Sequence, residues 1–156
     1  VQELVLLELG RPSFRHPPRR ASRPLRDTDL ADAAALDTAA FGLGWGMDAA
    51  GLADVCLATP TYRGRVVEQA GSPIAVAISG RDAELGFIQR LAVHPDHQRR
   101  GHGDALVADA LRWMGRGRVR RVLVNTHVDN TAARRLYARH GFVELPDRLM
   151  VSERDL

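Results

Sequence analysis

The segment that most limits the fold passes from an apolar strand pattern at Leu85–Val93, through a basic loop, to a helix pattern that ends near Met114. The loop reads Gln-Arg-Arg-Gly-His-Gly-Asp over residues 98–104, and its glycines permit positive φ angles. The backbone N–H groups of such a loop converge with the N-terminus of the following helix, which carries the positive end of the helix dipole. The pattern therefore predicts a pyrophosphate-binding loop, with charge added from the side by Arg99 and Arg100.

Two other phosphate-binding motifs do not fit this loop. The P-loop of nucleotide hydrolases requires a Gly-Lys-Ser/Thr ending, but all 22 basic residues of this chain are arginine. The dinucleotide-binding fingerprint requires a G-x-G-x-x-G pattern and an acidic residue at the end of a following strand, and neither is present. The absence of lysine also excludes a lysine general base or Schiff base.

The remaining patterns predict strands and helices within one core. A glycine-rich loop around Trp45 is either a lid that binds a substrate or a plain turn between helices. Residues 65–93 are typical of an antiparallel meander. The expected elements are a possible strand over 1–10, helices over 27–41 and 48–57, strands over 65–68, 74–79 and 85–93, a helix ending near 114, a strand over 119–126, a helix over 131–140, and a closing hairpin of 142–145 with 148–151.

The length of 156 residues predicts a single domain. Residues 11–24 carry four prolines and five arginines, a composition that forbids regular structure. We interpret them as a solvated connector rather than a surface that binds nucleic acid or an acidic partner. The expected organisation is an N-terminal strand with a Pro/Arg-rich arm at 1–19, followed by one domain at 20–156.

Charge and cysteine content narrow the function classes. The net charge of +3 suits an anionic ligand but falls short of a nucleic-acid-binding signature. Cys56 is the only cysteine, which excludes an internal disulfide and a cysteine-based metal cluster and favours a packing role for this residue. No apolar run approaches a membrane span, and the first ten residues lack the features of a signal peptide. We expect a soluble, cytoplasmic protein, monomeric or homodimeric, without a metal.

Two separate motifs resemble those of one enzyme family. Residues 98–103, Gln-Arg-Arg-Gly-His-Gly, are similar to the Gln/Arg-x-x-Gly-x-Gly/Ala signature of the GCN5-related N-acetyltransferases. Residues 130–142, Asn-Thr-Ala-Ala-Arg-Arg-Leu-Tyr-Ala-Arg-His-Gly-Phe, are similar to the family's Asn-x-x-Ala-x-x-Leu-Tyr-x-x-x-Gly-Phe segment. Asn130 is also suited to cap the helix that follows it. With the flanking elements, the resemblance covers residues 85–145.

The resemblance implies an α+β fold, the three-layer α/β sandwich of acyl-CoA N-acyltransferases. Its sheet is mixed and mostly antiparallel, with flanking helices and a parallel, splayed central strand pair that holds the pantetheine arm. It also implies acetyl-CoA as the cosubstrate and an amine acceptor of unknown identity. The implied cofactor-binding residues are Leu91, Ala92, Val93, Gln98, Arg99, Arg100, Gly101, His102, Gly103, Asp104, Asn130, Ala133 and Tyr137.

The resemblance assigns Tyr137 as the general acid that protonates the leaving thiolate. The general base stays open, because Phe87 and Asn125 occupy positions where relatives carry glutamate. The candidates for the base are Glu84, Glu68 and His127. Each of the three also has a structural interpretation as an exposed strand or turn residue.

The histidines of the basic loop are not expected to bind metal. No carboxylate or histidine stands beside His94, His97 or His102 at the spacing of metal ligands on a helix. We expect these three side chains to be solvated or to contact phosphate.

Three functional hypotheses follow. The first is an acetyl-CoA-dependent N-acetyltransferase that acts directly on a primary amine of a small molecule or a protein. The second is a CoA-sensing module without efficient catalysis, which the missing glutamates motivate. The third is a nucleic-acid-binding protein that uses the arginines between residues 11 and 26.

Overall fold

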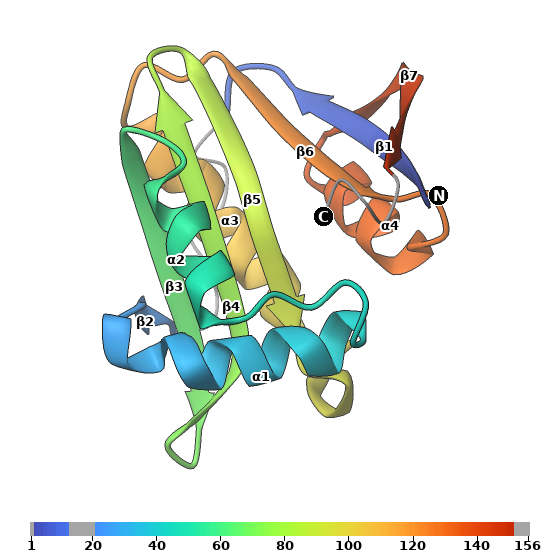
Figure 1. Cartoon of the computed structure of the whole chain (residues 1–156). Helices are drawn as coiled ribbons and strands as arrows, with labels where there is room; N and C mark the ends of the chain where they lie inside the picture. Colours follow the sequence, from blue (N-terminus) through green and yellow to red (C-terminus); the bar gives the residue numbers. More distant parts are fainter. Residues whose placement is uncertain (1, 13–20, 152–156) are drawn as a thin grey trace.

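The computed structural model describes residues 2–12 and 21–151, and its strands form one sheet with helices on both faces (Figure 1). No helix in this described part is both long and apolar enough to cross a membrane. The strands are β1 (Gln2–Leu9), β2 (Arg23–Pro24), β3 (Thr61–Gln69), β4 (Ser72–Asp82), β5 (Leu85–Val93), β6 (Arg121–His127) and β7 (Val143–Val151). The helices are α1 (Leu30–Phe41), α2 (Ala49–Leu57), α3 (His102–Gly115) and α4 (Thr131–Arg139), with short 3-10 helices η1 (Asp27–Asp29) and η2 (Pro95–His97).

Apolar clusters lie on both faces of the sheet. α1 and α2 cover one face, where Leu36 and Leu52 pack with Val76 and Ile78 of β4. α3 covers the other face, behind the strands in Figure 1, and shares a cluster there with α4. The predicted apolar side of α3 is confirmed, since its members are buried: Leu106, Val107, Ala110, Leu111 and Met114.

The strand order is β2-β3-β4-β5-β6-β1-β7. β3, β4 and β5 form the predicted antiparallel meander. β5 and β6 run parallel but pair only where residues 85–87 meet residues 121–123. Both strands continue past this pairing and diverge, as Figure 1 shows. The prediction of a mixed sheet with a splayed parallel central pair is confirmed.

The predicted hairpin around Pro146 is wrong, because residues 143–151 form the single strand β7. β7 pairs antiparallel with β1, and its register shifts between the pairs Leu7↔Glu144 and Val5↔Arg148. Proline has no N–H to donate to a ladder, so it is tolerated in a strand at such an irregularity. The turn signal of the sequence therefore marks a bulge within the strand.

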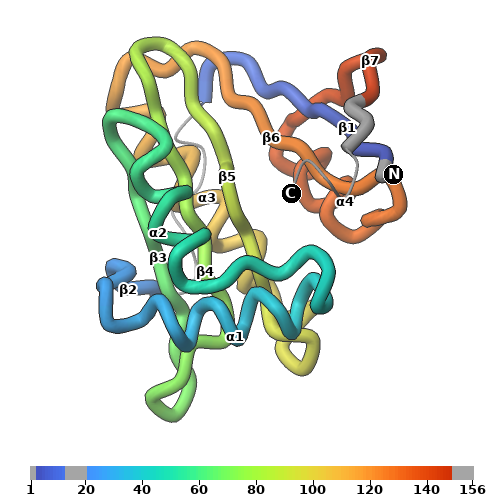
Figure 2. Tube along the Cα trace, in the orientation of Figure 1, coloured from blue at the N-terminus to red at the C-terminus, as the bar shows by residue number. Residues whose placement is uncertain are grey.

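β1 lies inside the sheet, between β6 and β7, although these neighbours come from the other end of the sequence (Figure 2). It pairs antiparallel with both of them. Its Val5 and Leu7 are 0% and 1% exposed and belong to the cluster under α3 and α4. The boundary after residue 19 stays a prediction, and residues 13–20 lie outside the described residues. The expectation that residues 11–24 form no regular structure is wrong at Arg23 and Pro24, which form β2 and pair with β3. β1 itself is part of the same sheet as the strands of the 20–156 region.

Candidate active site

A cavity of about 250 Å³ lies where β5 and β6 diverge. Its lining comes from both strands, the end of α1 with the loop after it, α4 and β1. The lining residues are Leu4, Phe41, Trp45, Ile88, Gln89, Arg90, Leu91, Val124, Asn125, Thr126, His127, Asn130, Ala133 and Tyr137. A second cavity, of about 500 Å³, lies toward the end of α2 and shares Ile88, Gln89, Val124 and Asn125 with the first. The two cavities therefore adjoin at the opening between the strands.

A bulge in β5 determines what faces the first cavity. The register with β4 passes from Ile78↔Arg90 to Ser79↔Ile88, which leaves Gln89 without a partner on β4. In a regular strand, residues two apart face the same side of the sheet. Here Ile88 packs in the cluster under α3, whereas Arg90 contacts α1 on the opposite face. The bulge therefore brings Arg90 to the face that α1 covers.

The loop after β5 has the positive φ angle that the sequence predicts at its first glycine. Gly101 has a φ of 87° at the N-cap of α3, and Arg99 is also left-handed, with a φ of 64°. Gln98 donates from Nε2 to the carbonyl oxygen of Val93 at 3.1 Å, which ties the loop to the end of β5. Arg99, Arg100 and Gly101 are exposed, and Nη1 of Arg100 lies 3.4 Å from Nδ1 of His97.

Gly103 lies where α3 and α4 come close together. A Cβ atom at this position would lie 3.2 Å from Cδ2 of Leu136 and 3.8 Å from Cγ2 of Val93. A larger side chain here would push α4 away from the start of α3.

Ala92, which the resemblance also assigns to cofactor binding, is buried in the cluster under α1 and α2.

Two loop residues have structural surroundings that the motif does not indicate. His102 is only 8% exposed, so its ring is not solvated as expected. The Oδ1 atom of Asp104 lies 2.8 Å from Nε2 of His140, so this carboxylate connects the first turn of α3 to the end of α4. No local pattern predicts this contact, because the two residues belong to different helices.

Tyr137 lines the cavity from α4. The predicted cap of this helix is confirmed, since Oδ1 of Asn130 accepts from the backbone N–H of Ala133 at 3.1 Å. Tyr137 is 4% exposed, and its ring contacts Phe142 edge to face, with 5.5 Å between ring centroids. Burial raises the pKa of Tyr137, because desolvation disfavours the phenolate. The phenol therefore keeps its proton throughout the neutral pH range.

His127 lines the same cavity from the end of β6. Its ring meets that of Trp45 edge to face, with 4.6 Å between ring centroids. Burial lowers the pKa of His127, and the positive charge of Arg90 lowers it further, while Asp129 opposes them. Its Nδ1 atom is buried and has no hydrogen-bond partner among the described residues. His127 is therefore a neutral imidazole at pH 7, and no described residue forms a hydrogen bond with its Nδ1 atom.

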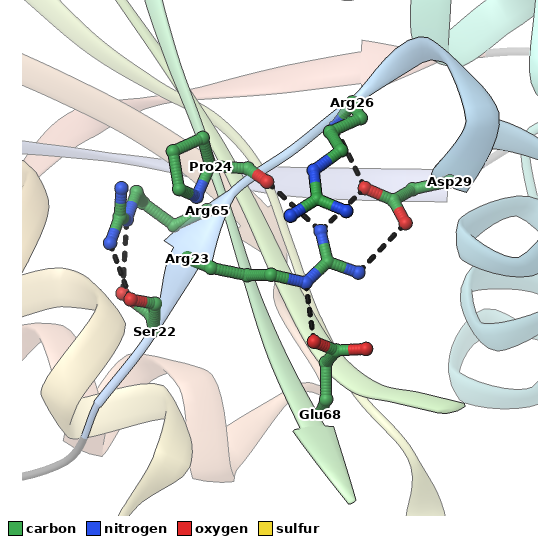
Figure 3. Close-up of polar contacts among 7 residues, drawn as sticks. All are labelled: Ser22, Arg23, Pro24, Arg26, Asp29, Arg65 and Glu68. Carbon is green, nitrogen blue, oxygen red and sulfur yellow. Dashed lines mark hydrogen bonds and ion pairs between the residues drawn. The ribbon is translucent and has the colours of Figure 1, made fainter. Parts of the chain in front are cut away.

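Glu68 belongs to the ion-pair cluster drawn in Figure 3. It lines neither of the two cavities. The guanidinium of Arg23 lies between Glu68 and Asp29 and donates to both carboxylates. Hydrogen bonds from Arg23 lower the pKa of Glu68 and, with a backbone N–H from Arg26, hold the pKa of Asp29 at about 2. Glu68 thus joins β3 to β2 and η1, away from the opening between β5 and β6.

Glu84 lies in the turn between β4 and β5. It is exposed, its Oε1 atom is 3.7 Å from Nε of Arg120, and its carbonyl oxygen accepts from the N–H of the same residue. It lines neither cavity. Of the three candidates for the base, only His127 therefore shares a cavity with Tyr137.

Sequence reasoning missed several residues of this site. Asp37 of α1 is 0% exposed and accepts two hydrogen bonds from Arg90. Phe41 and Leu4 line the cavity, the latter from the strand that the sequence places before the domain. The sequence does contain one sign of this ion pair. Asp37 and Arg90 each place a charge within an apolar pattern, and a buried charge needs a partner of opposite sign.

Most of the chain matches one known protein family. Residues 30–142 match the model described as the acetyltransferase (GNAT) family. The chain belongs to this family. Its three-layer fold, with a mixed sheet that opens between β5 and β6, is that of other GNAT proteins of known structure, so the resemblance drawn from the two motifs is confirmed.

Individual GNAT relatives show how far the likeness extends. A mycothiol acetyltransferase of Saccharomonospora viridis is 40% identical over 65 residues, which is 42% of this chain and 20% of that protein. The chain therefore spans a small part of that relative's length. The ribosomal-protein-S18-alanine N-acetyltransferase of Escherichia coli has a TM-score of 0.71 at 26% identity, over 80% of this chain and 78% of that one. A Mycobacterium tuberculosis protein solved with CoA has a TM-score of 0.64 at 24% identity, over 81% and 73%, which is a likeness of fold.

Proposed function

We propose that this GNAT domain transfers an acetyl group from acetyl-CoA directly to a primary amine of a small molecule or a protein. One observation carries the proposal. Tyr137 and His127 line a single cavity at the opening between β5 and β6, and β5 leads through η2 into the glycine-containing loop at 98–104. A donor site, a phenol that keeps its proton and a neutral imidazole are thus supplied by adjacent elements.

The donor would lie along β5. We assign the pyrophosphate to the main-chain N–H groups of residues 98–104 and the N-terminus of α3, with Arg99 and Arg100 beside it. Past residue 87, the edge of β5 toward β6 has no strand partner. The pantetheine amides would pair there with the backbone of Leu91 and Val93, as an added strand does.

The residues of the cavity would divide the proton transfers between them. The amine nitrogen attacks the thioester carbonyl carbon, so a C–N bond forms and the C–S bond breaks. His127 takes the proton that the nitrogen loses after attack, and Tyr137 donates a proton to the departing sulfur. The products are an amide and free CoA, with no acyl group bound to the enzyme at any stage. A neutral imidazole suits the first role, because only the unprotonated ring accepts a proton.

The pH dependence of turnover tests the assignment of His127. Its lowered pKa predicts that kcat/KM for the acceptor falls as pH decreases through a midpoint below 6.5, where the imidazole becomes protonated. The measurement is a pH–rate profile of CoA release in the parent and in His127→Asn. We expect the variant to be slower and to lack this acid limb. A variant that keeps both the parent rate and the limb would show that another group is the base.

The acetyltransferase hypothesis and the CoA-sensing alternative are separated by two measurements on one preparation. Calorimetry measures acetyl-CoA binding, and a thiol-reactive dye follows CoA release in the presence of a panel of primary amines and peptides. We expect binding together with amine-dependent release. Tight binding with no release for any amine would favour the sensing module, and the absence of binding would contradict both.

A further inference from the structure

A buried ion pair connects α1, β5 and the loop between α1 and α2. The carboxylate of Asp37 accepts from Nε of Arg90 at 2.8 Å and from Nη2 at 2.6 Å. The same carboxylate accepts from the backbone N–H of Met47 at 2.7 Å. Nη2 of Arg90 also donates to the carbonyl oxygen of Trp45 at 2.8 Å, and its guanidinium lies 4.1 Å from the centroid of the Phe41 ring. Residues 42–47, which we name the Trp45 loop, are thus held at Met47 by Asp37 and at Trp45 by Arg90.

The Trp45 loop reaches the opposite wall of the cavity. Arg90 belongs to β5, whereas the ring that Trp45 contacts, His127, belongs to β6. β5 and β6 have already diverged at this level. Trp45 therefore spans the opening between the two strands, with its carbonyl oxygen on Arg90 and its ring on His127, and it lines the cavity.

We propose that Arg90 is a positioning residue that holds the Trp45 loop so that Trp45 packs on His127 and limits which amines reach it. The inference rests on the proposed function for its kinetic consequence, but the geometry itself can be tested without turnover. Arg90 acts through Trp45 and is not assigned to contact the reacting atoms. Asp37 is 0% exposed, and its carboxylate accepts hydrogen bonds from both Nε and Nη2 of Arg90. This bidentate contact fixes the direction of the guanidinium.

The structure explains why arginine is needed at this position. The guanidinium donates to both oxygens of Asp37 and to the Trp45 carbonyl from fixed directions. The ammonium of lysine is a compact charge without this fork, so it would keep the charge pair with Asp37 but lose the simultaneous contacts. Arg90→Lys is therefore the variant that separates charge from geometry.

The first experiment uses the fluorescence of Trp45. The chain has two tryptophans, so Trp113→Phe leaves Trp45 as the only indole. A protonated imidazole quenches a neighbouring indole more strongly than a neutral one. The charged groups that face His127 are Arg90 of β5 and Asp129 of the turn before α4, and Trp45 itself is uncharged. In the Trp113→Phe chain we expect emission to fall with decreasing pH, with a midpoint below 6.5.

Adding Arg90→Lys to this background should remove most of the amplitude of the titration, because the indole leaves the imidazole. The matched control is Leu43→Ala, which changes a side chain of the same loop that is 94% exposed and should leave the titration unchanged. Acetyl-CoA affinity by calorimetry should be the same in all three proteins. A full-amplitude titration in the Arg90→Lys chain would overturn the proposal, whether or not an acceptor is known.

A second variant keeps the proposal testable if Arg90→Lys does not fold. Trp45→Ala leaves the ion pair of Asp37 and Arg90 in place. A proton NMR titration, with the His127 signal identified by its loss in His127→Asn, should show the pKa of His127 moving up toward 6.5 as its covering ring is removed. An unchanged midpoint would show that Trp45 does not cover His127 and would overturn the proposal.

Kinetics then test the consequence for the acceptor. With an amine that supports turnover and a bulkier analogue of it, Arg90→Lys and Trp45→Ala should each reduce the preference in kcat/KM for the smaller amine about tenfold to a hundredfold, while the KM for acetyl-CoA stays unchanged. A merely structural defect would affect both substrates. If no amine supports turnover, the proposed function fails, whereas the two titrations still decide the role of Arg90.

Discussion

A chain that lacks residues 1–9 should have no cooperative thermal transition in far-UV circular dichroism. β1 pairs with a strand on each edge, and its removal would leave β6 and β7 with unpaired backbone groups facing a gap. Burial of Val5 and Leu7 alone contributes about 3–6 kcal/mol, from about 1.5–3 kcal/mol for each fully buried side chain. This is a large share of the roughly 5–15 kcal/mol by which a domain is stable. A synthetic peptide with the sequence of β1 should restore the transition.

Two substitutions on the same strand provide a matched test of this expectation. Leu7→Asn places an amide in the cluster under α3 and α4, and should lower the melting temperature strongly. Glu8→Asn changes the neighbouring side chain, which forms an ion pair with Arg121 and is partly exposed, so its effect should be small. Equal melting temperatures in the two variants would contradict the position of β1 in the sheet.

Replacing Tyr137 by phenylalanine should lower kcat about 10²–10⁴-fold, the range that general acid–base catalysis contributes. Phenylalanine fills the same volume beside Phe142, so the cavity keeps its shape while the proton donor is lost. The raised pKa of Tyr137 ensures that the parent phenol is protonated at every pH of the assay. The measurement is the rate of CoA release at saturating acetyl-CoA, with acetyl-CoA affinity determined separately and expected to stay close to that of the parent.

The other tyrosine of the chain serves as the control. Tyr62 lies on β3, is 43% exposed and lines neither cavity, so Tyr62→Phe should retain the parent kcat. If Tyr137→Phe turned over as fast as Tyr62→Phe, then Tyr137 would not be the acid. A water molecule or another group would have to supply the proton to the leaving sulfur.

The parts of the structure that the sequence predicts are those set by local rules. The positive φ of Gly101, the start of α3 and the capping of α4 by Asn130 each depend on a few adjacent residues. The buried side of α3 follows from helical periodicity. The family motifs add the divergence of β5 and β6, which periodicity alone does not contain.

The parts that could not be predicted depend on partners distant in sequence. Nothing in the sequence around Glu68 indicates that it is paired, because its partner Arg23 lies 45 residues earlier in the chain (Figure 3). Asp37 and Arg90 are stable in the interior only because they pair with each other. The bulge at Gln89, which brings Arg90 to the face of α1, contains no glycine from which it could be predicted. The place of β1 beside β6 and β7 is likewise a long-range pairing, which no local pattern specifies.

The insertion of β1 also dictates an order of events in folding. Leu4 pairs with His127 on one side and with Leu149 on the other, so β1 has no partner strand until β6 and β7 have been synthesised. Closing so long a loop is entropically costly and slow, and meanwhile an apolar strand stays open to self-association. Leu4 also lines the cavity, so the cavity is complete only after β1 has inserted. Refolded protein should therefore regain activity only in the slowest phase of its refolding kinetics.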